Sequence, residues 1–365
     1  MSKGALSLAL LLGTVNASCA HAAQAPAVPV VEPASSPNAP PQVWRAKPSR
    51  RFTGNLVLAG ETIYGGGLDR RVVAVDLASG QQRWASRLGG IIGGGVVVGG
   101  DTVYAATTRP EGKVSALDAK TGQRIWRTSI GAVNAPLALI GGLVVAPTQR
   151  GNIVALDART GEVRWHHQLG VARTGAVPGD SGTFIVATVD SLFRLDPKEG
   201  RVVLRQGSPG AVVSPWIRYA GLLVAGTSDS LVVGVDPDSL VTRWQVLLDA
   251  PVLNSPAASG DTLFAATRRG SLYRITPSSS PSPSPSSTMQ AERVAELDWP
   301  VTAPVSIVNG LVLLGGADGG LRAFRPDGTE AWRLQLRWPV ELGVVLLDDG
   351  MLAAGGDGDL HRYGR

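Results

Sequence analysis

The sequence has only one cysteine, Cys19, and four histidines among its 365 residues. A single cysteine cannot form a disulfide framework, and so few histidines exclude a Cys/His metal cluster. We therefore expect a fold that is stabilised by its hydrophobic core, with no bound metal.

Charge and long apolar runs are also scarce. Charged residues make up 17% of the sequence against 44% hydrophobic residues, which excludes a disordered chain over most of the length. The formal net charge is +5, but no dense basic run accompanies it, so we expect no nucleic-acid partner. Beyond the N-terminus, no segment reaches the roughly 18 uninterrupted apolar residues of a membrane-spanning helix. The 46 glycines and 25 prolines instead favour a fold of many short strands and turns.

The N-terminus has the pattern of an export signal. Lys3 precedes a largely apolar stretch at residues 5–15, and small residues follow it. Two processing routes fit: signal peptidase cleavage after a small residue, giving a signal peptide at 1–22, or cleavage after Ser18 with lipidation of Cys19. Ala17-Ser18-Cys19 resembles a bacterial lipobox, although Asn16 stands where that motif usually has Leu. Residues 23–42, rich in Ala and Pro, are predicted to form a tether.

The rest of the chain repeats one unit. Trp follows Asp by eight residues in four segments: Asp76 to Trp84, Asp118 to Trp126, Asp157 to Trp165 and Asp236 to Trp244. Asp196 continues the series with Leu204 at the Trp position, so the period is 39 to 42 residues. Extending the period past Thr276 and Arg325 gives eight repeats, with a Ser/Pro tract at 278–288 predicted to be a surface loop.

Each repeat contains four short β-rich runs separated by Gly-containing turns, and four strands in about 40 residues are typical of a propeller blade. The last repeat ends before its fourth strand, whereas Val43-Trp44-Arg45 precedes the first repeat without a blade of its own. We predict an all-β, eight-bladed β-propeller of four-stranded antiparallel blades over residues 43–365, whose ring is closed by the N-terminal strand.

Repeats such as Val154-Ala155-Leu156-Asp157 through Thr160-Gly161 to Trp165 resemble the PQQ-like (quinoprotein-type) β-propeller superfamily. Their regular position makes the tryptophans blade-docking residues rather than a cofactor stack. This set comprises Trp44, Trp84, Trp126, Trp165, Trp244 and Trp332, with Trp299 assigned beside them. Trp216, on a predicted inner strand, faces either the central channel or a neighbouring blade.

Within that superfamily, an exported, single-domain, eight-bladed chain with a possible lipobox is most similar to a lipoprotein scaffold of the outer-membrane β-barrel assembly machinery. The resemblance implies a monomeric, non-enzymatic envelope protein in the periplasm, with a lipid on Cys19 as its membrane contact. The alternative is a PQQ- or small-ligand-binding enzyme, which would need Ca²⁺ ligands and a carboxylate base in the channel. Among the predicted inner-strand residues, only Glu341 offers a carboxylate; the others are Asn134, Thr174, Ser214, Asn254 and Thr302.

No other catalytic constellation is present. His166 and His167 are adjacent on a predicted strand and point to opposite faces, so they cannot chelate one metal. We therefore expect no catalytic, cofactor-binding or metal-binding residue.

The turns between second and third strands differ in charge around the ring. Blades 1–3 carry Arg70, Arg71, Arg109 and Arg150, whereas blades 7 and 8 carry Asp318, Asp357 and Asp359. These turns share one rim of a propeller, so we predict a basic arc and an acidic arc. The four arginines are the predicted contacts with an acidic surface of a protein partner.

Overall fold

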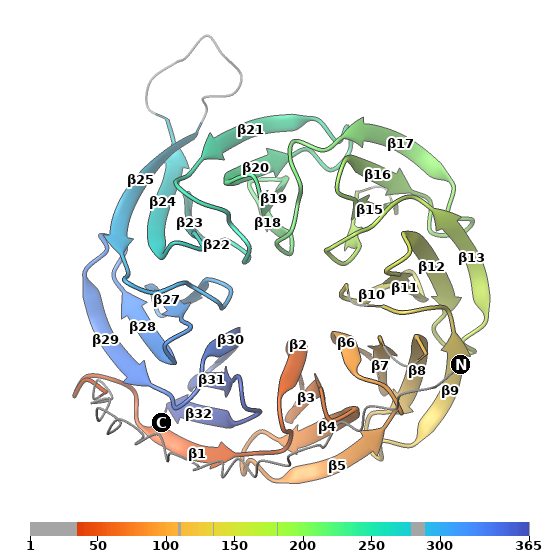
Figure 1. Cartoon of the computed structure of the whole chain (residues 1–365), viewed down its shortest axis with the longest axis horizontal. Helices are drawn as coiled ribbons and strands as arrows, with labels where there is room; N and C mark the ends of the chain where they lie inside the picture. Colours follow the sequence, from red (N-terminus) through yellow and green to blue (C-terminus); the bar gives the residue numbers. More distant parts are fainter. Residues whose placement is uncertain (1–34, 109–110, 134, 181, 279–288, 365) are drawn as a thin grey trace, which may run out of the picture. The chain divides into compact units, whose positions relative to one another are not determined.

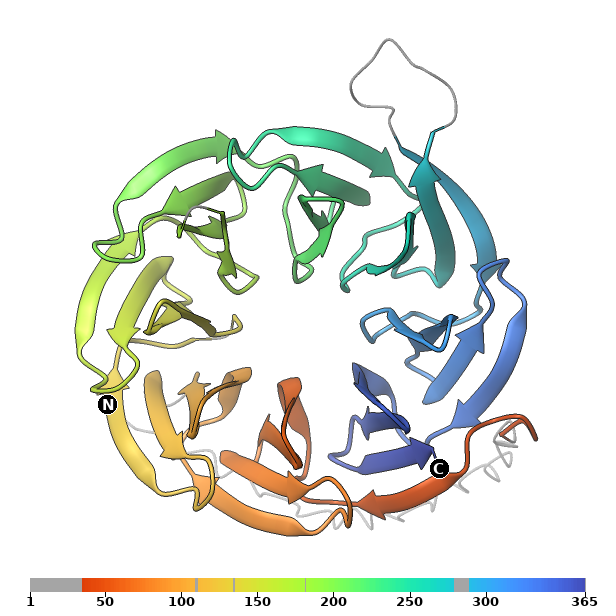
Figure 2. The same cartoon turned by 180° about the vertical axis from the view of Figure 1, so that it is seen from behind.

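The computed structural model describes residues 35–108, 111–133, 135–180, 182–278 and 289–364. Within these ranges, 32 strands form eight four-stranded antiparallel sheets, arranged as the blades of a ring (Figure 1; Figure 2 shows the ring from behind). The predicted all-β, eight-bladed propeller is confirmed. No described segment forms a helix of the length and apolarity needed to cross a membrane.

The strands follow the blades in chain order. Blades 1 and 2 contain β2 (Phe52–Ala59), β3 (Thr62–Gly67), β4 (Arg71–Asp76), β5 (Gln82–Arg87), β6 (Ile92–Gly99), β7 (Thr102–Thr107), β8 (Lys113–Asp118) and β9 (Arg124–Ser129). Blades 3 and 4 contain β10 (Ala138–Ile140), β11 (Leu143–Pro147), β12 (Asn152–Asp157), β13 (Val163–Gln168), β14 (Val177–Pro178), β15 (Phe184–Ala187), β16 (Ser191–Leu195) and β17 (Val202–Gly207).

The other half of the ring repeats this plan. Blades 5 and 6 contain β18 (Ile217–Tyr219), β19 (Leu222–Gly226), β20 (Leu231–Val235), β21 (Thr242–Leu247), β22 (Ala257–Ser259), β23 (Thr262–Ala266), β24 (Ser271–Pro277) and β25 (Met289–Glu296). Blades 7 and 8 contain β26 (Ser306–Val308), β27 (Leu311–Gly315), β28 (Gly320–Phe324), β29 (Glu330–Gln335), β30 (Val340–Leu347), β31 (Gly350–Gly355), β32 (Leu360–Gly364) and β1 (Gln42–Ala46). The predicted Ser/Pro loop joins β24 to β25, and its residues 279–288 lie outside the described ranges.

The core lies between blades. Each of eight hydrophobic clusters takes its members from two neighbouring blades, so every interface of the ring has its own core. The middle strands are therefore covered on both faces, which explains why β4 and β8 read as apolar runs rather than alternating patterns.

The N-terminal strand closes the ring as predicted. β1 pairs antiparallel with β32 and supplies the fourth strand of blade 8. In this sheet the ring of His361 is buried, and its Nδ1 lies 3.1 Å from Oε1 of Gln42. An amide oxygen only accepts, so Nδ1 donates, and burial lowers the pKa of His361.

Residues before β1 also contact the ring. Ser36 N–H donates to the Arg333 carbonyl on β29 over 2.9 Å, and Arg333 N–H donates to Ser36 Oγ over 3.1 Å. Ala39 packs against the core between blades 7 and 8. Residues 35–41, assigned to the tether from sequence, are thus bonded to the propeller.

The ring has two rims. Because successive strands of a blade run in opposite directions, the turn between second and third strands lies on the same side as the connections between blades. We call this side the connection rim. The opposite side, the hairpin rim, carries the other two turns of each blade.

Candidate functional site

Four of the six predicted docking tryptophans donate a hydrogen bond to the next blade around the ring. The indole N–H groups reach the first carbonyl after the repeat Asp: Trp44 to Leu77 over 3.0 Å, and Trp84 to Ala119, Trp126 to Ala158 and Trp165 to Pro197 over 2.9 Å each. Each ring lies against the turn glycine of that blade; a Cβ on Gly122 would come within 2.6 Å of the Trp84 ring. Trp244 and Trp332 occupy the same register position on β21 and β29.

The interface between blades 4 and 5 has two leucines in place of the tryptophan and the turn glycine. Leu204 stands at the Trp position of β17, and Leu240 stands at the turn-glycine position of blade 5, where its φ is +57°. Leu240 is fully buried and belongs to the same core cluster as Leu204. The leucine side chain thus fills the space that an indole fills elsewhere.

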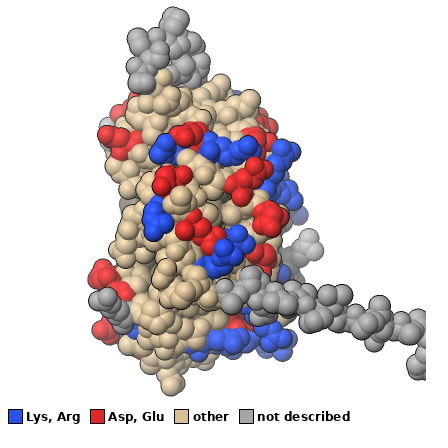
Figure 3. Space-filling view, turned by 90° about the vertical axis from the view of Figure 1, so that its left-hand side faces the viewer, with Lys and Arg blue, Asp and Glu red and all other residues tan. Residues whose placement is uncertain are grey.

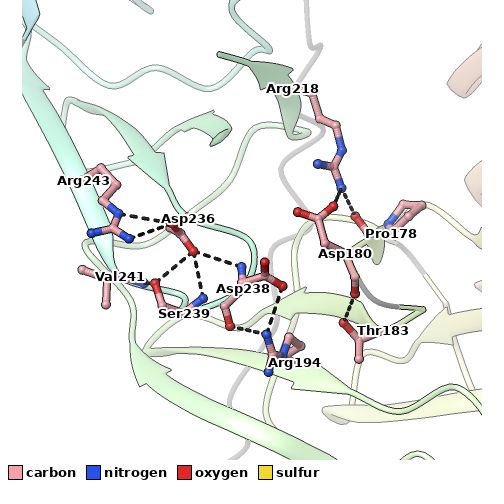
Figure 4. A network of polar contacts seen from close by, with 10 residues as sticks. All are labelled: Pro178, Asp180, Thr183, Arg194, Arg218, Asp236, Asp238, Ser239, Val241 and Arg243. Carbon is pink, nitrogen blue, oxygen red and sulfur yellow. Dashed lines mark hydrogen bonds and ion pairs between the residues drawn. The ribbon is translucent and has the colours of Figure 1, made fainter. Parts of the chain in front are cut away.

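Polar groups cross the same interface (Figure 4). Arg194 of blade 4 donates to the backbone carbonyl and the carboxylate of Asp238 in blade 5. Arg218 of blade 5 donates to the Pro178 carbonyl over 2.8 Å and pairs with Asp180 in blade 4. These bonds supplement an interface that lacks the tryptophan bond.

Two further tryptophans pack on the inner side of interfaces that lack an outer-strand tryptophan. Trp216 belongs to the core between blades 4 and 5, which decides between the two positions predicted for it. Trp299 belongs to the core between blades 6 and 7, where β25 has no tryptophan. Its assignment to the outer-strand set was wrong, because it lies in the connection after β25. Neither indole N–H has an acceptor among the described residues.

The predicted channel residues are shifted by one position in two blades. Ala172 and Val212 make equivalent isolated bridges before their inner strands, so the residues at the predicted channel position are Arg173, which is exposed, and Val213, which is half-buried. Thr174 and Ser214 are at most 1% exposed and cannot line a channel, so their assignment was wrong.

The other channel candidates form bonds between blades. Asn254 donates to the Val301 carbonyl over 3.3 Å, and Thr302 donates to the Val340 carbonyl over 2.7 Å. Glu341 accepts two hydrogen bonds from Arg51, over 2.9 and 3.0 Å. Asn134 lies outside the described residues.

The histidine pair does not converge on one site. On β13 the His167 ring packs 5.6 Å from the Trp165 ring, whereas His166 borders a different surface hollow. In the described part of the chain, no group of three or more His, Cys, Asp or Glu side chains could hold a metal ion.

The connection rim carries many unpaired arginines. Of the predicted partner contacts, Arg70 and Arg150 are exposed and form no ion pair with another described residue, whereas Arg71 pairs with Asp69 over 2.6 Å. Arg109 lies outside the described residues. Arg268 and Arg269, which the sequence places in the corresponding turn of blade 6, are also exposed and form no ion pair with another described residue. Sequence reasoning missed four further arginines of this rim with the same properties: Arg50, Arg87, Arg173 and Arg337.

The acidic side chains of the connection rim form ion pairs or hydrogen bonds with neighbouring residues. In blade 8, Asp357 pairs with Lys47 over 2.7 Å and Asp359 pairs with Arg45. Asp318 in blade 7 accepts from Gly320 N–H over 2.8 Å and pairs with Arg322 over 3.6 Å. The hydrogen bond from Thr188 lowers the pKa of Asp190 in blade 4. The expected acidic arc is therefore neutralised by its own neighbours.

The outer wall carries both signs of charge. Arg274 pairs with Glu292 across β24 and β25, and Arg333 pairs with Glu330 on β29. On the side with β25 and β29, basic and acidic groups lie interspersed (Figure 3). Among the described residues, exposed arginines without an ion pair are more numerous on the connection rim, although the hairpin rim also carries some, such as Arg159, Arg201 and Arg325.

Together, the blade count, the ring closure and the tryptophan docking define an eight-bladed propeller of the PQQ-repeat class. A family model described as "Outer membrane protein assembly factor BamB" matches residues 34–177 and 169–316. The chain belongs to this family. No curated protein sequence matches it.

Solved structures share the fold at low sequence identity. BamB from Moraxella catarrhalis has a TM-score of 0.75 at 16% identity, covering 89% of this chain and 100% of that one. The computationally designed Ika8 protein has a TM-score of 0.71 at 14% identity, with 88% and 99% covered. The quinohemoprotein alcohol dehydrogenase from Comamonas testosteroni has a TM-score of 0.71 at 13% identity, with 90% and 76% covered.

Proposed function

We propose that this chain is a non-enzymatic scaffold of the cell envelope that binds protein partners through its connection rim during outer-membrane protein assembly. The observation that carries the proposal is the set of unpaired arginines on one rim of a propeller whose family is an outer-membrane assembly factor. Aligned positive charge speeds the encounter with an acidic partner and selects its orientation.

Apolar side chains on the same rim supply contact area. Trp338 is 45% exposed in the connection between blades 7 and 8, with the Arg337 guanidinium 5.8 Å from its ring centre. Leu68 and Val189 are exposed in turns of blades 1 and 4. Trp and Arg are the residues most enriched at binding hot spots, so Arg337 and Trp338 are the central contacts we propose beside Arg70, Arg71, Arg109 and Arg150.

The geometry favours a scaffold over a quinone-dependent enzyme. That reaction would require a free carboxylate in the channel to abstract a proton and oxygen ligands for Ca²⁺. The carboxylate of Glu341, the predicted candidate, is bound to Arg51 through both oxygens. Buried Thr174 and Ser214 cannot reach a channel ligand.

We further propose a periplasmic location, with export directed by residues 1–22 and a lipid on Cys19 as the anchor to the outer membrane. These residues lie outside the described ranges.

The function is tested by measuring folded outer-membrane β-barrel proteins in cells that lack this chain. The wild-type chain should restore their level, whereas a triple variant with Arg150→Glu, Arg268→Glu and Arg337→Glu should not. Its matched control carries Arg159→Glu, Arg201→Glu and Arg325→Glu, which change the same charge at exposed, unpaired arginines of the hairpin rim. Equal restoration by both triple variants would contradict rim-mediated binding, and unchanged barrel levels without the chain would contradict the assembly role.

A further inference from the structure

A cavity of about 500 Å³ opens on the connection rim at blade 1. Four arginines line it, from three consecutive parts of the blade: Arg50 before β2, Arg70 and Arg71 at the β3–β4 turn, and Arg87 at the end of β5. Among the described residues of its lining, Asp69 is the one acid.

The charges in this cavity are not balanced. Asp69 accepts two hydrogen bonds from Arg71, over 2.9 and 2.6 Å, and one from Ser49 over 3.2 Å. Arg50, Arg70 and Arg87 are exposed and have no ion pair in the described structure. Three guanidinium charges are therefore left to face the cavity without a counter-charge from the protein.

Two local features oppose this clustering. Arg71 and Arg87 are direct partners in the β4–β5 ladder, and like charges directly opposite each other destabilise a sheet. Arg70 has a φ of +65° at a turn position where blades 3, 6, 7 and 8 have glycine and blade 5 has Ser230 with a φ of +66°. A left-handed backbone is sterically unfavourable for a residue that has a Cβ. Strain and repulsion that converge on one cavity are typical of a binding site.

We propose that this cavity binds a phosphate group. A phosphate monoester carries nearly two negative charges and several acceptor oxygens on one atom, so it can accept from several guanidinium groups at once. A carboxylate offers one charge and two oxygens and would leave more of the excess unpaired than a phosphate does. Leu68, 41% exposed, lines the same cavity and gives the organic part of a phosphate ester an apolar contact.

The phosphate could come from a lipid headgroup or from a soluble compound, and the test separates the two. Inorganic phosphate is titrated calorimetrically into the full chain, with acetate as the carboxylate comparison. Binding to vesicles of phosphatidylcholine with phosphatidic acid is compared with binding to phosphatidylcholine alone. Vesicle binding that phosphate competes away supports a lipid headgroup, and phosphate binding without vesicle binding supports a soluble phosphate.

Arg70→Gln and Arg87→Gln should each weaken phosphate binding by about tenfold, the loss expected for a hydrogen bond between charged groups. Arg150→Gln is the matched control, because Arg150 is an unpaired arginine in the equivalent turn of blade 3 and lies outside the cavity. Melting curves verify that each variant is folded. The proposal is wrong if phosphate does not bind saturably, if acetate binds equally well, or if Arg150→Gln has the same effect.

This inference does not depend on the scaffold function. Phosphate binding is measured on the purified chain without a protein partner, and the rim variants that test the scaffold leave all four cavity arginines intact.

Discussion

At the scale of single residues, the tryptophans differ in what their N–H groups do. Trp84 donates to the Ala119 carbonyl over 2.9 Å, whereas the buried Trp216 N–H has no acceptor in the described structure. Both indoles are 9% exposed, so their apolar burial is comparable. The two indoles therefore differ mainly in the hydrogen bond that Trp84 makes and Trp216 lacks.

We expect Trp84→Phe to lower the free energy of unfolding by about 1 kcal/mol more than Trp216→Phe. The first change removes one of the two hydrogen bonds to the Ala119 carbonyl, which still accepts from the Tyr64 hydroxyl over 3.1 Å, and the second removes an N–H that has no partner in the described structure. Urea denaturation measures both, with the exposed Trp338→Phe as a surface control. Equal losses for Trp84→Phe and Trp216→Phe would show that the bond adds nothing to docking.

A second prediction concerns the backbone strain at Arg70. Glycine adopts a φ of +65° without steric cost, so Arg70→Gly should raise the free energy of unfolding by about 0.5–1 kcal/mol. The same variant should weaken phosphate binding by about tenfold, as Arg70→Gln does. Arg150→Gly is the control, because Arg150 lacks a positive φ and gains nothing from glycine. Thermal melts compare them, and destabilisation by Arg70→Gly would contradict the account of strain.

At the scale of strands and turns, the Leu204–Leu240 pair acts as one unit. Both members of the Trp–Gly pair are leucine at this interface, and the two leucines belong to one core cluster, so the packing of each depends on the other. Leu204→Trp alone should clash with Leu240, and Leu240→Gly alone should leave a cavity beside Leu204. The double variant recreates the arrangement of Trp165 and Gly200 in the preceding interface.

We therefore expect the double variant to be more stable than the sum of the single effects by at least about 1 kcal/mol, the range seen for residues in contact. A double-mutant cycle of urea unfolding measures this coupling. Additive effects would mean that the two positions do not share one packing site.

The closing strand has its own pH dependence. The pKa of His361 is lower in the folded state than in the unfolded chain because burial disfavours the charged ring, although nearby Asp359 opposes this and Arg45 adds to it. Between the two pKa values the unfolded chain binds more protons. This contribution to stability is fully present above about pH 6.5 and is lost as the pH falls below it.

Hydrogen exchange at about pH 7.5 and 5.5, corrected for intrinsic rates, should show weaker protection of β1 at the lower pH. His361→Asn keeps a donor for Gln42 without a titratable ring, so its β1 should lose most of this pH dependence. Unchanged pH dependence in His361→Asn would place the effect elsewhere.

Sequence reasoning worked where the repeat supplies markers. The Asp and Trp positions fixed the third and fourth strands of the blades and the closing role of β1. It failed in the inner strands, because these are only two or three residues long in blades 3–7 and carry no marker. The predicted position was one residue too late in blade 4, so buried Thr174 was assigned to the channel and exposed Arg173 was overlooked.

At the scale of the whole propeller, the connection rim carries more exposed arginines without an ion pair than the hairpin rim does among the described residues. The sequence shows where arginines and acids occur, and it predicted the basic turns at Arg70 and Arg150. It could not show that Asp357 and Asp359 are neutralised by Lys47 and Arg45, because these cations come from residues about three hundred positions earlier. Only closure of the ring brings them together.

The central claim is that the connection rim binds an outer-membrane assembly component. The most direct measurement places a photoreactive amino acid at position 338 of the full chain, cross-links it in native envelopes and identifies the products by mass spectrometry. Position 159 on the hairpin rim is the control. We predict a specific product from position 338 containing an outer-membrane assembly component, and none from position 159. Absence of such a product from 338, or the same product from both positions, would contradict the account.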